Sequence, residues 1–305
     1  MNNLNTGVWP TMLTPYTSDN QIDWKSLDEL IEWYIASGVS GLFAVCLSSE
    51  IFHLTEIERI KLASHIVKRV NQRVQIVSGV LLSDNPENAI KQVYDTGVAA
   101  VVCLASQLYP KNSDNNEYLE IIKKIFSISN DIPLGIYESP LPYHKILSAD
   151  ELKNLVSSHR LYFMKDTSCD IEIIKQKLEI TTESKCNFYN AHTPTILESL
   201  KLGAAGYCGI AANFYPELYA WLCKHYKTQP ELSESLSEFL KICDSIIHNK
   251  YPVSAKKYQQ INGINLKPLC RSSKFKLNNA ESASLSSLKN TIKEWHEKLK
   301  IWSYE

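Results

Sequence analysis

The sequence lacks the long apolar runs and the charge imbalance that mark several classes of protein. No run approaches the ~20 consecutive apolar residues of a transmembrane helix. The first residues, Met1 to Asn5, have neither the basic nor the apolar region of a secretory signal. The formal net charge of −1 argues against a general electrostatic attraction to nucleic acid or to an anionic membrane. We therefore expect a soluble, cytoplasmic protein that binds neither nucleic acid nor membrane.

The sequence also lacks paired cysteines and metal-binding spacings. Its eight cysteines are scattered with no Cys-x-x-Cys pair, and Cys46, Cys103 and Cys208 lie in strand-like runs. This pattern predicts buried free thiols in a reducing compartment and no disulfide frame. Neither the cysteines nor His53 have the spacing of metal ligands, so we expect no metal and no other cofactor.

What the sequence does contain is an alternation of short apolar runs with amphipathic segments. Hydrophobic residues make up 44% of the chain and charged residues 21%, as in a globular protein with a sizeable core. The short runs are apolar along their whole length, which is typical of parallel strands buried on both faces. They occupy residues 7–13, 41–47, 74–80, 99–104, 133–137, 161–165, 185–189 and 207–211.

Eight successive strand–helix units predict an α/β fold, a closed (β/α)8 TIM barrel over residues 1–227. An open doubly wound sheet is the alternative, but no Gly-x-Gly-x-x-Gly follows the first strand and there is no P-loop. Residues 228–305 show helical apolar spacing without a flexible linker before them. They predict a C-terminal helical extension packed on the barrel, in which residues 267–279 have no clear assignment.

One lysine differs from the others in its surroundings. Lys165 ends the apolar run 161–164, which is too short for a helix. An amine held there is partly stripped of water, which we expect to lower its pKa and to make its nucleophilic form accessible. The alternative is a lysine whose amine reaches solvent from a strand end.

The strand ends supply the partners that such a lysine needs, because barrels of this type carry their chemistry at the C-terminal ends of the strands. Tyr137 ends the fifth predicted strand, next to Lys165 on the sixth. A phenol beside an amine can shuttle protons during imine formation, and the hydroxyls of Ser48 and Ser49 can bind a carboxylate. Glu50 is expected to bond loop backbone instead. The constellation suits a 2-oxo acid bound as a Schiff base.

These motifs resemble the dihydrodipicolinate synthase / N-acetylneuraminate lyase family over about residues 7–300. The resemblance implies a class I aldolase, a homo-oligomer (tetramer or dimer), in which Lys165 forms an imine with pyruvate or a related small-molecule 2-oxo acid. It also implies that Tyr137 is the proton shuttle and that Ser48, with the backbone around Ser49, binds the substrate carboxylate. The matching motifs are Thr14-Pro15, Ser48-Ser49-Glu50, Tyr137-Glu138-Ser139-Pro140, Lys165-Asp166-Thr167-Ser168 and Gly203-Ala204-Ala205-Gly206.

The sequence departs from this family in the half of the site that selects the second substrate. Leu47 replaces the first hydroxyl of the strand-two motif, and Ser106 and Gln107 stand where synthases carry the tyrosine pair of an intersubunit proton relay. Pro142 stands at the position of the synthase arginine that holds the aldehyde's carboxylate. Ala191-His192-Thr193-Pro194 replaces the Gly-x-Asp-Glu motif of sialic acid lyases. We therefore expect a divergent member whose second substrate is open.

Other residues are weaker candidates for the site. Tyr109 could supply a relay from a neighbouring subunit, and His192 and His144 could replace the missing arginine as polar contacts, although a lone loop histidine is usually only a satisfied loop residue. Cys208 and Gly209 are expected to line the pocket floor without a catalytic role.

Three functions remain open from the sequence. The first is a Schiff-base lyase or aldolase, which the pair of Lys165 and Tyr137 favours. The second is a dehydratase of a 2-oxo-3-deoxy sugar acid, which shares the imine but eliminates water. The third is a non-catalytic 2-oxo-acid-binding protein, which the altered relay at Leu47, Ser106 and Gln107 suggests.

Overall fold

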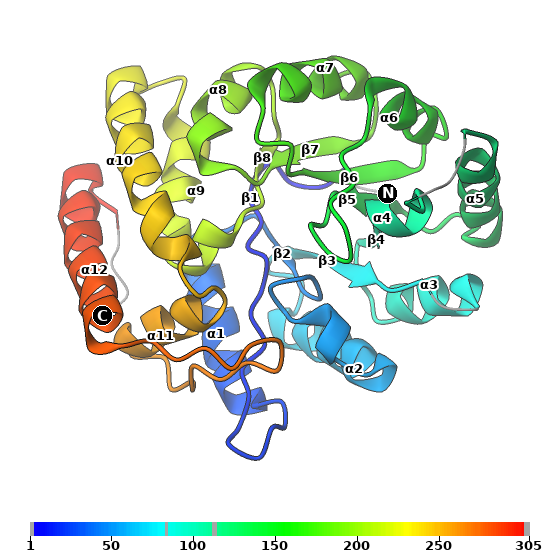
Figure 1. Cartoon of the computed structure of the whole chain (residues 1–305). Helices are drawn as coiled ribbons and strands as arrows, with labels where there is room; N and C mark the ends of the chain where they lie inside the picture. Colours follow the sequence, from blue (N-terminus) through cyan, green and yellow to red (C-terminus); the bar gives the residue numbers. More distant parts are fainter. Residues whose placement is uncertain (1–2, 83–84, 112–114, 302–305) are drawn as a thin grey trace.

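The computed structural model, which describes residues 3–82, 85–111 and 115–301, contains a parallel sheet of eight strands that curls into a barrel (Figure 1). The ring closes where Thr11 bridges Phe43, with the Met12 amide donating to the Phe43 carbonyl over 3.0 Å. The predicted (β/α)8 TIM barrel is thus confirmed. The strands are β1 (Gly7–Val8), β2 (Gly41–Phe43), β3 (Gln75–Val80), β4 (Ala100–Leu104), β5 (Leu134–Tyr137), β6 (Leu161–Asp166), β7 (Asn187–Asn190) and β8 (Gly206–Tyr207).

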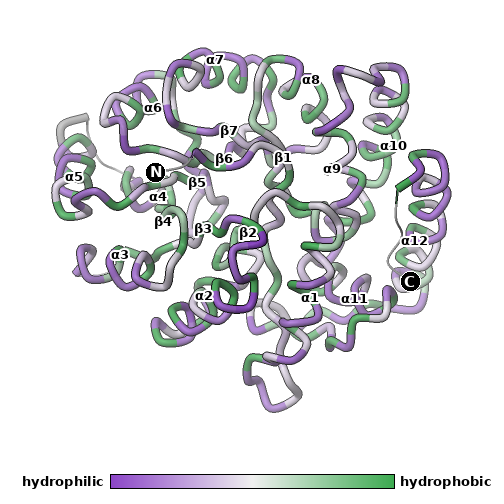
Figure 2. The backbone as a smooth tube through the Cα atoms, turned by 180° about the vertical axis from the view of Figure 1, so that it is seen from behind, coloured by the Kyte–Doolittle hydropathy of each residue, from purple (hydrophilic) through white to green (hydrophobic). Residues whose placement is uncertain are grey.

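Helices surround this sheet, and their ends follow from local sequence signals. Asp23 caps the first helix by accepting a hydrogen bond from the Ser26 amide, and Thr55 forms a reciprocal capping box with Glu58. Figure 2 shows apolar and polar residues alternating along the helices, as expected of helices that cover a sheet. They are α1 (Trp24–Ala36), α2 (Glu56–Val70), α3 (Pro86–Tyr94), α4 (Ala105–Leu108), α5 (Asn115–Ile128), α6 (Ala149–Val156), α7 (Ile171–Thr181), α8 (Ile196–Lys201) and α9 (Pro216–His225).

Aromatic rings fill the interior of the barrel below the strand ends. The Phe163 ring lies 4.8 Å from Tyr189 and 5.7 Å from Trp9, measured between centroids. A Cβ on Gly41 would come within 2.4 Å of the Trp9 ring, so glycine at this position leaves room for the indole. The barrel interior below the strand ends is thus a packed core, and in barrels of this type ligands bind at the C-terminal ends of the strands.

Three further helices, α10 (Pro230–His248), α11 (Val253–Ile261) and α12 (Asn279–Leu299), lie together on one side of the barrel (Figure 1). The last of them begins at Asn279 because Asn278 forms a capping box with Glu281. Among the described residues, no helix combines the length and the apolar character needed to cross a bilayer.

The segment between α11 and α12, unassigned from the sequence, is tied to the loop that follows β2. The Glu50 carboxylate accepts hydrogen bonds from the Arg271 amide at 2.6 Å and from the Ser272 amide at 2.7 Å. Its other oxygen pairs with the Lys256 amine at 2.8 Å, and both side chains are buried. Glu50 therefore bonds loop backbone, as expected, and fixes the C-terminal segment beside the open end of the barrel.

Candidate active site

A cavity of about 760 Å³ lies at the C-terminal ends of the strands. It collects side chains from β5 and β6, from the loops that follow β2, β7 and β8, and from the C-terminal segments. Of the residues predicted to form the site, it is lined by Ser48, Tyr137, His144, Lys165, His192 and Gly209.

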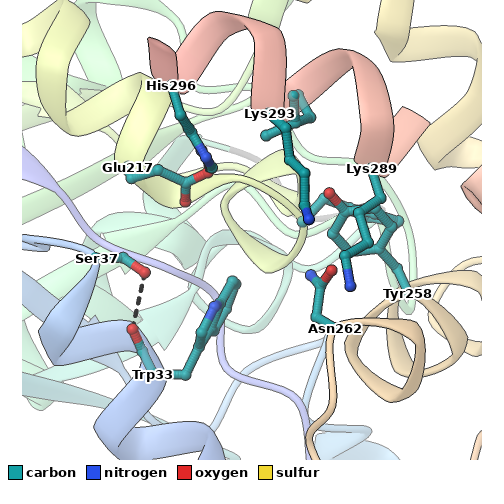
Figure 3. Close-up of a pocket in the computed structure, with 10 residues that line it drawn as sticks. Trp33, Ser37, Glu217, Tyr258, Asn262, Lys289, Lys293 and His296 are labelled. Atoms are coloured by element: carbon teal, nitrogen blue, oxygen red, sulfur yellow. Dashed lines mark hydrogen bonds and ion pairs between the residues drawn. The ribbon is translucent and has the colours of Figure 1, made fainter. Parts of the chain in front are cut away.

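A second cavity is shown in Figure 3, between α1, α9, α11 and α12. His296 and Glu217 face each other there, with 2.7 Å between Nε2 and Oε1, while Lys289 and Lys293 extend from α12. Its volume is about 40 Å³. That space holds no more than a few water molecules, so this cavity is not the substrate site.

Lys165 and Tyr137 lie side by side at the floor of the large cavity. They are register partners on the parallel strands β5 and β6, and the Lys165 amine lies 3.9 Å from the centroid of the Tyr137 ring. Lys165 points into the barrel because side chains two residues apart on a strand share a face, and Phe163 belongs to the interior aromatic cluster. Lys165 is only 3% exposed and Tyr137 only 4%. An amine and a phenol thus share one buried surface.

The pKa of Lys165 corrects the expectation drawn from the sequence. Burial acts to lower this pKa, but the neighbouring Tyr137 phenol and the Cys208 and Cys46 thiols act against it, and the net shift is upward. The sequence argument included the burial of the amine but not the acidic groups that the fold gathers around it. Burial in turn raises the pKa of the Tyr137 phenol. Both groups therefore carry their proton near neutral pH, and the Lys165 ammonium has to lose its proton before its nitrogen is nucleophilic.

A buried ion cluster holds the ends of β5 and β6 together behind this pair. The Lys177 amine lies 2.5 Å from a Glu138 oxygen and 2.7 Å from an Asp166 oxygen, and all three side chains are inaccessible to solvent. Glu138 follows Tyr137 in the chain and Asp166 follows Lys165, so the cluster fixes the backbone that positions both of these side chains.

The sequence reasoning missed Lys177 because an amphipathic helix usually exposes its lysines. The position of Lys177 on the helix could have indicated its burial, since Ile174, Leu178 and Thr181 on the same face of α7 are also buried.

This cluster predicts a pH dependence of stability. Burial, together with the nearby Asp166 carboxylate, raises the pKa of Glu138 to about 7 from its usual 4.5. A carboxyl with a raised folded-state pKa stabilises the fold fully below the unfolded value, and this contribution is lost as the pH rises toward 7. We expect wild-type protein to lose on the order of 2 kcal/mol of unfolding free energy between pH 5 and pH 8 through this group. Urea denaturation at both pH values should show a smaller loss in Glu138→Gln, and an equal loss would contradict the assignment.

The loop after β2 presents one of its two predicted serines to the cavity. Ser48 lines the cavity, and its hydroxyl donates to the Thr11 hydroxyl over 3.0 Å. Ser49 is fully buried, with its hydroxyl 2.7 Å from the Met12 carbonyl oxygen and 2.8 Å from that of Ala44. Ser49 therefore holds the turn in which the predicted strand 41–47 ends early, and Ser48 alone offers a hydroxyl to a ligand.

A further hydroxyl reaches the same place from the C-terminal part of the chain. Tyr251, between α10 and α11, lines the cavity, and its hydroxyl accepts a hydrogen bond from the Asn213 amide group over 2.8 Å. The same amide group of Asn213 also donates to the Thr11 hydroxyl over 3.4 Å, and Thr11 accepts from Ser48, so Tyr251 and Ser48 belong to one hydrogen-bonded network. Sequence reasoning did not find this tyrosine because it lies in a stretch that predicted only packing helices.

Comparison with known proteins identifies the family. The profile of the Dihydrodipicolinate synthetase family matches residues 4–294. The chain belongs to this family. Among its relatives, 4-hydroxy-tetrahydrodipicolinate synthase of Clostridium novyi (strain NT) is 23% identical over 297 residues, covering 95% of this chain and 97% of the relative. The same enzyme of Oceanobacillus iheyensis is 26% identical over 262 residues, covering 82% and 84%.

Solved structures of the family share the fold of this member. The 4-hydroxy-tetrahydrodipicolinate synthase of Methylacidiphilum fumariolicum SolV superimposes with a TM-score of 0.85 at 20% identity, covering 98% of this chain and 99% of that one. YagE, a prophage protein of E. coli K12 in complex with pyruvate, gives 0.84 at 19% identity over 97% and 99%. CdNal of Clostridium difficile in complex with mannosamine gives 0.84 at 17% identity over 94% and 98%. At these identities the likeness concerns the fold.

The two histidines predicted as polar contacts both line the cavity of this family member. His144 lies 2.8 Å from the Thr167 hydroxyl, and His192 lies 3.1 Å from that of Thr195. Burial lowers the pKa of both imidazoles below the usual 6.5, so both are mostly neutral at pH 7. They can exchange hydrogen bonds with a ligand there, but they do not replace the charge of an arginine.

The remaining candidates do not reach the cavity within this chain. The Tyr109 hydroxyl donates to the Glu151 carbonyl over 3.4 Å, and its ring packs 5.0 Å from that of Tyr118. Gln107 is bonded to the backbone of Leu82. Cys208 is fully buried, and burial raises its pKa to about 12, which keeps the thiol protonated.

Proposed function

We propose that this family member is a lyase or aldolase that forms a Schiff base with pyruvate or a related 2-oxo acid. One observation carries the proposal: the amine of Lys165 is buried at the floor of a large cavity, over the phenol of Tyr137. Membership of the dihydrodipicolinate synthetase family supports it, as does the pyruvate in the similar fold of YagE. A solvated surface lysine would have neither the cavity nor the phenol.

The geometry suggests a sequence of steps for the two residues. Lys165 loses a proton to solvent, and its neutral nitrogen attacks C2 of the 2-oxo acid, giving a carbinolamine. Tyr137 delivers a proton to the departing hydroxyl, which leaves as water, and the imine forms. The Tyr137 phenolate then takes a proton from C3, which converts the imine into an enamine and restores the phenol. In the direction of synthesis, this carbon nucleophile attacks an aldehyde. In the direction of cleavage, a carbon–carbon bond breaks, the aldehyde is released and the enamine is formed again.

The carboxylate of the 2-oxo acid needs donors close to Lys165, and we assign this role to Ser48 and Tyr251. Both line the cavity, and their hydroxyls belong to one hydrogen-bonded network. Tyr251 would supply in this chain the second hydroxyl that Leu47 lacks. Hydrogen bonds to a charged group contribute about 1.5–3 kcal/mol each, so two donors can hold the carboxylate of a small 2-oxo acid in a fixed position.

Replacing Tyr251 by phenylalanine tests this assignment. We expect the KM for pyruvate to rise about 10-fold or more, because one hydrogen bond to the carboxylate is lost, while kcat changes little. Steady-state kinetics with pyruvate as the varied substrate would measure both constants. Tyr226→Phe, at the end of α9, is a matched control. A fall in kcat at unchanged KM would contradict a role in binding.

Replacing Tyr137 by phenylalanine tests the proton shuttle. We expect imine formation and turnover to slow by ~10²-fold or more, as when a general acid–base group is removed. Tyr137 also contributes to the raised pKa of Lys165, so its loss should lower that pKa and move the alkaline rise of the imine-formation rate to lower pH. Stopped-flow rates of imine formation between pH 6 and pH 10 would show both effects. A change confined to KM would count against the shuttle.

The first experiment is reduction by borohydride in the presence of pyruvate, followed by mass spectrometry of the intact protein and its peptides. We expect one pyruvate-sized reduced adduct on the peptide that contains Lys165. Folded protein that forms no adduct with pyruvate or with larger 2-oxo acids would overturn the proposed function.

A further inference from the structure

We infer that the second substrate is an uncharged aldehyde with an apolar body, such as an aryl or branched-chain aldehyde, and that it carries neither a carboxylate nor a phosphate. The inference rests on the proposed function, because the enamine on Lys165 is the nucleophile that would attack this aldehyde. It concerns the outer half of the cavity, where the chain departs from its family.

The first argument is the charge of the cavity wall. Among the described residues that line the cavity, Lys165 is the one lysine or arginine, and its amine is committed to the imine. Three cations lie nearby, but each already faces carboxylates of the protein: Lys177 with Glu138 and Asp166, Lys256 with Glu50, and Arg271 with Glu58. An anionic aldehyde would therefore lose water without gaining a cation, which is unfavourable.

The charged group that α10 adds to the wall is negative. Asp244 lines the cavity with its side chain 22% exposed, 3.3 Å from a nitrogen of His248. Any positive charge on His248 is thus balanced by this carboxylate. His144 and His192 are mostly neutral at pH 7. Among the described residues of the outer cavity, no lysine or arginine offsets Asp244.

The second argument is the apolar rim. Three of the eight large hydrophobic side chains exposed on the described part of the chain line this one cavity: Phe52 at 37%, Leu141 at 49% and Phe275 at 60%. They come from the loop after β2, the loop after β5 and the segment before α12. Exposed apolar residues from three distant segments, gathered around a reactive amine, indicate a ligand that covers them.

Two threonine hydroxyls on the wall are already hydrogen-bonded within the protein. The Thr167 hydroxyl donates to the Glu138 carbonyl over 2.6 Å, and the Thr193 hydroxyl lies 2.8 Å from that of Tyr219. Leu47, next to Ser48 in the chain, also lines the cavity. A sugar chain would have to compete with hydrogen bonds made within the protein, whereas an apolar body only displaces water from Leu47 and the rim.

The reaction is balanced without any further reactant. C3 of the enamine attacks the aldehyde carbon, a carbon–carbon bond forms, and the aldehyde oxygen takes up a proton from the Tyr137 phenol. Water then hydrolyses the new imine, which restores the Lys165 amine and releases a 4-hydroxy-2-oxo acid. Nothing is oxidised or reduced, and the same steps in reverse cleave that product.

Competing acceptors test the inference. Pyruvate at a fixed saturating concentration would be combined with benzaldehyde, glyceraldehyde or succinic semialdehyde, and the 4-hydroxy-2-oxo acid products quantified by chromatography. We expect kcat/KM for benzaldehyde to exceed the other two values about 10-fold or more. Phe275→Ser and Phe52→Ser should each lower that value several-fold while leaving the reduced pyruvate adduct on Lys165 unchanged. Ile242→Ser, at a residue 73% exposed outside the cavity, is the matched control.

The outcomes separate the inference from the proposed function. If the pyruvate adduct forms but glyceraldehyde or succinic semialdehyde is the better acceptor, or no acceptor reacts, the inference is wrong and the Schiff base stands. If no 2-oxo acid forms an adduct, both are wrong. Leu141→Arg offers a further check, because a cation added at the rim should raise kcat/KM for succinic semialdehyde relative to benzaldehyde.

Discussion

Lys165→Ala is expected to abolish imine formation and to lower turnover on the order of 10⁴-fold, while the protein stays folded. Alanine removes the nucleophilic nitrogen, and no other lysine lines the cavity among the residues that the structure describes. The measurement combines borohydride trapping with pyruvate, which should add no mass to the variant, and a steady-state assay. Circular dichroism and thermal unfolding would show that the barrel has formed.

Lys185→Ala is the control for this variant, because Lys185 is exposed and packs over the outward-facing Tyr162 ring, 5.8 Å from its centroid. It should be trapped by borohydride as efficiently as the wild type. Turnover retained in Lys165→Ala, or an adduct that persists on another lysine, would show that the imine mechanism is wrong.

Lys177→Met is expected to lower the free energy of unfolding by about 3–5 kcal/mol, the usual cost of removing one partner from a buried ion cluster. Lys177 is the ammonium that faces both Glu138 and Asp166. Without it, two carboxyl groups remain buried beside each other, and at pH 7 their repulsion and desolvation oppose folding. Because whole domains are stable by only about 5–15 kcal/mol, this change should be visible as a large shift in the urea midpoint.

Lys175→Met provides the matched control, since Lys175 is exposed on the same helix. Its effect should stay within about 0.5 kcal/mol, as for most surface substitutions. The loss in Lys177→Met should also shrink at pH 5, where Glu138, with its raised pKa, holds more of its proton. Equal effects of the two substitutions would mean that the buried cluster does not stabilise the fold. If the variant remains folded, slower imine formation would show that the cluster positions Tyr137 and Lys165.

The sequence alone was sufficient for the barrel and for the central pair of the site. Continuous apolar strands that alternate with amphipathic helices can hardly pack otherwise than as parallel strands covered by helices. In a parallel barrel consecutive strands are neighbours, so residues that end successive strands lie next to each other. For this reason Tyr137 and Lys165 could be placed side by side before any coordinates were known, and the register of β5 and β6 confirms their pairing. The roles of the two residues remain proposals.

Only the tertiary structure shows which residues from distant parts of the sequence surround this pair. Tyr251 and the rim residue Phe275 come from the C-terminal part of the chain, and Lys256 pairs with Glu50 across 206 residues of sequence. The direction of the Lys165 pKa shift depends on a phenol from β5 and on two thiols that follow β2 and β8. Local patterns report which residues are buried and how they alternate, but they carry no information about which distant side chains meet. Electrostatic and ligand-binding properties depend on those contacts between distant residues, and therefore only the folded chain defines them.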